Sequence, residues 1–98
     1  MIVEHKIKIP LEVRDYIQKA WYEKDMAATL LSFMISKGTY SKERFEQMKN
    51  EHLEAFINFC LIYHEIEEEY LVPILGKRPL NWFLTFFDGV ITAYAEEN

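Results

Sequence analysis

The chain has 98 residues, a formal net charge of −5, and a composition that is 50% hydrophobic and 15% aromatic. This length fits a single domain covering residues 1–98. The apolar content excludes an intrinsically disordered chain, and the acidic balance excludes a typical nucleic-acid-binding surface, which is basic.

Neither the apolar runs nor the cysteine content points to a membrane or secreted protein. Cys60 is the only cysteine, so no disulfide can form within the chain. No apolar stretch reaches the roughly 20 residues needed to cross a bilayer, and the first residues lack the apolar run of a signal peptide. We therefore expect a cytoplasmic protein that binds neither membranes nor nucleic acid.

Residues 2–9 alternate between apolar and polar side chains. One side of an extended chain would carry Val3, His5, Ile7 and Ile9, and the other side Ile2, Glu4, Lys6 and Lys8. This period of two predicts a short strand with one polar face.

Residues 10–37 carry the period of an amphipathic helix. Pro10 suits the first helical position, and Gly38 after Lys37 is typical of a helix end. Apolar positions recur at alternating steps of four and three, as in the seam of a coiled coil. The seam consists of Val13, Ile17, Ala20, Lys24, Ala27, Leu31 and Met34.

Residues 41–72 predict a second long helix. Ser41 is a suitable N-cap, and Pro73 ends or kinks the helix. Because only a short link separates the two helices, they must lie antiparallel as a hairpin. The second seam consists of Phe45, Met48, His52, Ala55, Phe59, Ile62 and Ile66.

Lys24 and His52 interrupt the two apolar seams. Folding the hairpin about residue 39 places Lys24 opposite Glu51 and Glu54, so we predict an ion pair of Lys24 with one of these carboxylates. Such a polar seam fixes the register of packed helices. The alternative is a catalytic or ligand-binding pair with shifted pKa values, which we consider weaker because the two glutamates satisfy both groups.

The same register places the acidic run 65–69 beside Lys8 and Arg14 at the base of the hairpin. We read this run as a solvated acidic face that meets basic residues, as charged runs on helices usually are.

Residues 80–96 allow two interpretations. Asp88-Gly89 between two aromatic and β-branched runs favours a β-hairpin. A polar stripe at steps of three and four favours a third helix. We expect the β-hairpin, which gives the N-terminal strand a partner, and therefore a helix-dominated α+β fold. The alternative is an all-α three-helix bundle.

Residues 55–63 form the most informative segment, because Asn58 is their only polar member. A helix that is apolar nearly all round is buried on several sides or covered by another chain. We expect a contact surface made of Leu53, Phe56, Ile57, Leu61 and Trp82. Cys60, which lies between Phe59 and Leu61, is expected to be a buried filler.

His64 and Glu68 share a helix face and are the main candidates for metal ligands, with Cys60 or His52 as a further member of such a site. No Glu-x-x-His, His-Glu-x-x-His or paired-cysteine motif accompanies them, so we expect no metal and no other cofactor. No catalytic constellation is evident either, and we expect no enzymatic activity.

The leading functional hypothesis is a small non-enzymatic interaction module that associates with itself or with another protein. A first alternative is a small-ligand or metal-binding protein that uses His64 and Glu68. A second alternative is an acidic inhibitor or antitoxin-like binder of a basic protein.

Overall fold

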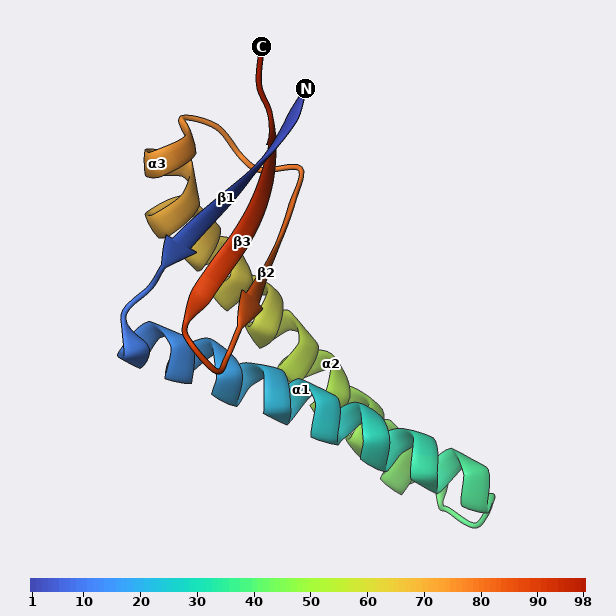
Figure 1. Cartoon of the computed structure of the whole chain (residues 1–98). Coiled ribbons are helices and arrows are strands. Elements are labelled where there is room, and N and C mark those ends of the chain that lie inside the picture. Colours follow the sequence, from blue (N-terminus) through green and yellow to red (C-terminus); the bar gives the residue numbers. More distant parts are fainter.

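The structure, a computed structural model, describes all 98 residues and has the predicted helix-dominated α+β architecture (Figure 1). The elements follow in the order β1 (Ile2–Lys8), α1 (Leu11–Lys37), α2 (Lys42–Ile66), the π-helical turn η1 (Glu67–Leu71), α3 (Val72–Leu75), β2 (Asn81–Thr85) and β3 (Val90–Glu96). The molecule is elongated and measures 55 × 28 × 18 Å. None of its helices is both long enough and apolar enough to cross a membrane.

The two long helices form an antiparallel hairpin that is bounded by the predicted capping residues. Gly38 adopts a left-handed backbone conformation (φ 71°), and its N–H donates to the carbonyls of Met34 and Ile35. Ser41 Oγ accepts a hydrogen bond of 3.1 Å from the N–H of Arg44. This bond satisfies one of the backbone donors left free at the start of α2.

The C-terminal segment is the predicted β-hairpin and not a third helix. β2 and β3 are antiparallel and joined by a turn in which Gly89 has a φ of 69° and the Val90 N–H donates to Asp88 Oδ1 at 3.0 Å. β1 pairs antiparallel with the other side of β3, so the strand order is β1-β3-β2. β3 is thus the central strand, and its Ile91 and Ala93 are fully buried.

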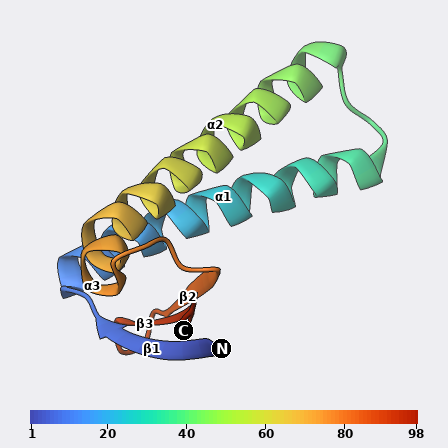
Figure 2. The ribbon, with the colours of Figure 1, turned by 90° about the horizontal axis from the view of Figure 1, so that it is seen from above.

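The sheet packs against only one end of the hairpin, and the core lies between them. Figures 1 and 2 both show the distal parts of α1 and α2 projecting beyond the three strands. Between residues 24 and 61, Met48 is the only buried residue. The core cluster consists of Ile7, Ile9, Ile17, Ala20, Ile62, Ile66, Leu71, Trp82, Ile91 and Ala93.

The stagger between the two helices differs from the predicted one by about one helical turn. Met34 and Met48 border the same hollow near the tip, and the Lys24 ammonium lies 5.1 Å from the centre of the Phe59 ring. In both pairs the midpoint between the two residue numbers lies near residue 41, whereas the prediction folded the hairpin about residue 39. A seam repeats every seven residues, so a shift of half a repeat still places apolar residues opposite apolar residues.

The end of α2 widens into the π turn η1. Leu71, five residues after Ile66, would point about 140° away from it on a regular α-helix. In the wider turn Leu71 instead reaches the buried face and has no exposed surface. Pro73 does not end the helix as predicted, because it lies at the start of α3, where a missing N–H is tolerated, and the chain leaves the helix at Gly76 in a left-handed conformation (φ 76°).

Candidate functional site

A shallow apolar hollow of about 320 Å³ opens where β2 approaches the long helices. Its walls come from three elements: Trp21 lies on α1, Tyr63 lies on α2, and Phe83 and Phe86 belong to β2 and the turn after it. Trp21 and Phe86 meet edge to face with 5.8 Å between their ring centroids. All eight lining side chains are hydrophobic.

A second hollow of about 300 Å³ continues along the hairpin beyond the sheet. It shares Phe59 and Tyr63 with the first and adds Lys24, Phe56 and Cys60. We call the two hollows together the aromatic trough. The trough is apolar and partly covered, and Lys24, Cys60 and Tyr63 are the titratable groups among its lining residues.

Lys24 is the only charged residue that lines the trough. Its ammonium lies 5.1 Å from the centre of the Phe59 ring and 5.8 Å from that of Trp21. These distances allow cation–π attraction. Lys24 forms no ion pair, so the predicted contact with Glu51 or Glu54 is wrong.

The other members of the predicted polar seam lie apart from Lys24. Glu51 is exposed and accepts a hydrogen bond of 3.2 Å from Gln47 within its own helix. His52 is half-buried against Phe56, with 6.4 Å between the ring centroids. Glu54 is exposed. The seam is therefore held by aromatic and aliphatic packing, and the four polar residues do not converge on one site.

Four of the five residues expected at a contact surface are accessible. Leu53, Phe56, Ile57 and Leu61 are each about half exposed on α2. The prediction is wrong for Trp82, because this residue is only 4% exposed and belongs to the core. The sequence shows that Trp82 lies on a strand, but it does not show which face of that strand meets the helices.

The prediction that Cys60 is buried is also wrong, because its side chain is exposed. The prediction assumed that the apolar segment 55–63 is covered on several sides. The sheet covers one side of this segment only, where Ile62 and Tyr63 pack toward β2, and it leaves Cys60 on an exposed side of the helix.

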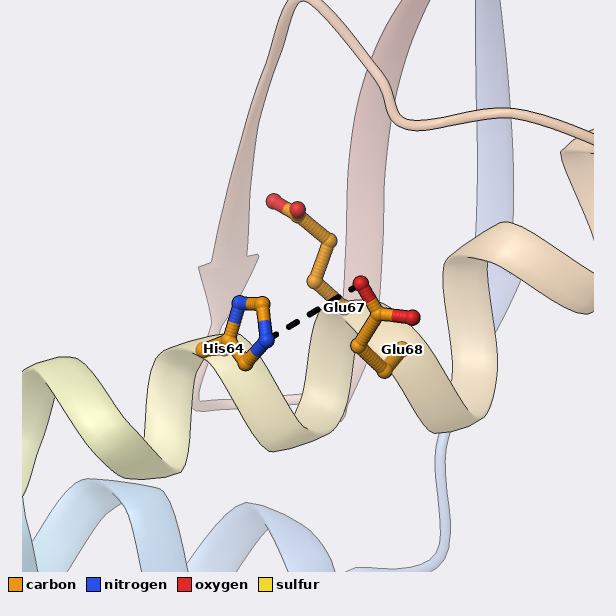
Figure 3. A group of neighbouring side chains, drawn as sticks. All are labelled: His64, Glu67 and Glu68. Atoms are coloured by element: carbon orange, nitrogen blue, oxygen red, sulfur yellow. Dashed lines mark ion pairs between the residues drawn. The ribbon is translucent and has the colours of Figure 1, made fainter.

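A cluster of His64, Glu67 and Glu68 lies where α2 passes into η1 (Figure 3). One ligand atom from each residue lies within 4.8 Å of the others. His64 Nε2 and Glu68 Oε1 face one another at 3.9 Å. One imidazole and two carboxylates form a donor set that a divalent cation such as Zn²⁺ accepts.

Both carboxylates of this cluster already have partners within the chain. Arg78 lies 2.6 Å from Glu68 and 3.8 Å from Glu67. The Trp82 indole N–H donates to Glu67 at 3.0 Å. The acidic run thus meets Arg78 of the loop before β2, and not Lys8 or Arg14 as predicted. The cluster thus links the end of α2 to the loop before β2 and to β2 itself, through ion pairs with Arg78 and a hydrogen bond from Trp82.

Tyr63 lies between this charged cluster and the aromatic trough. Its ring stacks on Trp82 with centroids 4.0 Å apart, and its hydroxyl donates to the Trp82 carbonyl at 3.3 Å. Burial, and to a lesser degree the charge of Glu67, raise the pKa of Tyr63 above its ordinary value.

The raised pKa of Tyr63 predicts a loss of stability at high pH. Below the ordinary tyrosine pKa of about 10, the phenol is neutral in both the folded and the unfolded chain. As the pH rises above this value, the unfolded chain ionises first, so the free energy of unfolding falls. The Tyr63→Phe protein has no phenol at this position and so lacks this contribution to the pH dependence. At neutral pH its free energy of unfolding is lower than that of wild type by about 1 kcal/mol, because the hydrogen bond of the hydroxyl is lost.

Urea unfolding of both proteins from about pH 8 to about pH 11 tests this expectation. All other ionisable groups are common to the two proteins, so the difference between them isolates Tyr63. The difference in free energy of unfolding between wild type and Tyr63→Phe should become smaller as the pH rises. A difference that is independent of pH contradicts the expected direction.

Phe83, Phe86 and Arg78 are parts of the site that sequence reasoning missed. The alternation of β2 could have placed Phe83 and Trp82 on opposite faces. No local signal could have found Arg78, because its partners are brought to it by the path of the loop. Comparisons with protein-family models, with curated proteins and with solved structures find no match to this chain.

Proposed function

We propose that this chain is a non-enzymatic protein–protein interaction module that associates with itself through the uncovered face of its helical hairpin. The observation that carries the proposal is the exposure of four large apolar side chains on one helix: Leu53, Phe56, Ile57 and Leu61. Contiguous apolar residues of this kind mark contact surfaces in soluble proteins.

The composition of the surface supports association and not catalysis. The four exposed residues are all apolar, and the aromatic trough, which adjoins them at Phe56, holds one lysine, one tyrosine and one cysteine among hydrophobic side chains. The carboxylates closest to it are engaged by Arg78 and Trp82. Interfaces between copies of a chain are enriched in aromatic residues and poor in charge, as this surface is.

Ile57→Ser/Leu61→Ser tests the proposal. Each serine should remove at least about 1 kcal/mol of binding energy, so the dissociation constant of the self-associated form should rise by roughly thirtyfold or more. Light scattering over a wide concentration range measures the mass in solution. Circular dichroism should show unchanged helix content, because both side chains are already half exposed.

A matched control lies on the other helix. Met26 and Leu30 have the same spacing and similar exposure on α1, so Met26→Ser/Leu30→Ser should leave the mass distribution unchanged. If wild type is a monomer at every concentration, the proposal is wrong. Unfolding of the Ile57→Ser/Leu61→Ser protein would instead assign these residues to the core and also overturn the proposed interface.

A further inference from the structure

Phe87 is the most exposed large hydrophobic residue of the chain, at 94%. It lies in the turn between β2 and β3, directly before Asp88. Asp88 is exposed and uses Oδ1 to accept the Val90 N–H, and it takes part in no ion pair. The turn therefore presents an uncovered aromatic ring next to an unpaired carboxylate.

The aromatic trough presents the complementary features. Its distal hollow is lined by Phe56, Phe59 and Tyr63, and its one charged group is the unpaired ammonium of Lys24. A phenyl ring fits such a hollow through aromatic packing. A carboxylate placed beside Lys24 gains a partly desolvated ion pair at the edge of an apolar surface.

We propose that two copies of this chain form a two-fold dimer in which Phe87 of each copy inserts into the aromatic trough of the other and Asp88 pairs with Lys24. This inference rests on the proposed self-association and specifies its contacts. The occupant is a second copy because the turn and the trough belong to the same chain and match in apolar character and in charge. A two-fold axis between them closes the assembly with two identical contacts.

The available area agrees with a dimer. Burial of Phe87 together with the exposed halves of Phe56 and Phe83 removes on the order of 400 Å² of apolar surface per copy. A standard interface buries about 800 Å² per partner. Leu53 and Ile57 add further half-exposed apolar surface next to Phe56 on α2, and the polar rim that surrounds an interface core makes up the rest.

The contact of Phe87 is tested by measuring the dimer dissociation constant of Phe87→Ala, by dilution and light scattering. We expect a rise of at least about tenfold, because the ring is an anchor at the centre of each contact. Phe33→Ala is the matched control, since Phe33 is exposed on α1 and does not line the trough. It should change the constant by less than about twofold. Thermal melts should confirm that both variants are folded.

The charge pair is tested by a double-mutant cycle of Lys24→Gln and Asp88→Asn. Asparagine keeps the side-chain acceptor for the Val90 N–H, so the turn is preserved. Each single variant should raise the dimer dissociation constant by about threefold or more. The constant of the double variant should lie within about twofold of the larger of the two single-variant constants, because the second substitution removes a contact that is already lost.

The outcomes separate the two proposals. A monomeric wild type overturns both and leaves the trough to a different partner. A dimer whose dissociation constant is unaffected by Phe87→Ala overturns the insertion while the proposed self-association stands. Additive effects of Lys24→Gln and Asp88→Asn overturn the placement of Asp88 beside Lys24.

Discussion

Replacement of Trp82 by alanine should lower the free energy of unfolding by about 3–5 kcal/mol. Trp82 is 4% exposed, stacks on Tyr63, and donates its indole N–H to Glu67. It is the residue through which β2 is attached to α2. Because a domain of this size has a total stability of about 5–15 kcal/mol, the loss is a large part of the whole.

Trp82→Phe separates the two contributions of this residue. Phenylalanine keeps the aromatic stack on Tyr63 but removes the donor to Glu67, so we expect a loss of about 1–2 kcal/mol. Urea unfolding measures both variants. A Trp82→Ala protein that loses less than about 1 kcal/mol would show that β2 does not pack on α2 as described.

Leu71→Ala should cost about 2–5 kcal/mol, because the side chain is fully buried and alanine leaves a cavity behind it. The expectation depends on the π turn, since an uninterrupted α-helix would point Leu71 away from the core. The measurement therefore examines the backbone conformation of η1 as well as the packing.

Leu61→Ala is the control for this prediction. Leu61 is the same residue type on α2 and is 59% exposed. We expect its replacement to change the free energy of unfolding by less than about 1 kcal/mol, measured at a concentration where the chain is monomeric. Similar losses for Leu71→Ala and Leu61→Ala would mean that η1 does not bring Leu71 into the core.

The local parts of the fold could be predicted because their signals lie within short segments. The N-cap at Ser41, the helix end at Gly38 and the turn at Asp88-Gly89 each depend on the backbone preferences of one or two residues. The alternation in residues 2–9 likewise predicts the strand β1. These features fix which segments are helices and strands.

The contacts between segments could not be predicted to the same degree. The apolar seams of α1 and α2 indicate which faces meet but not by how many residues the helices are staggered, and the predicted partner of Lys24 was therefore wrong. Cys60 was expected to be buried because its neighbours in the sequence are apolar. No local pattern shows which side of this helix the sheet covers. Arg78 reaches Glu68 only because the loop before β2 turns back toward the helix.

The π turn has a consequence for how the length of this chain can vary. Glu69 lies within the turn and is exposed. A chain that lacks this one residue would have Leu71 four positions after Ile66, which is the spacing of the buried face of a regular α-helix. One residue can thus be lost at this place while the hydrophobic face continues unbroken. Among chains that descend from a common ancestor with this one, η1 is therefore a place within a helix where a single-residue difference in length can be accommodated.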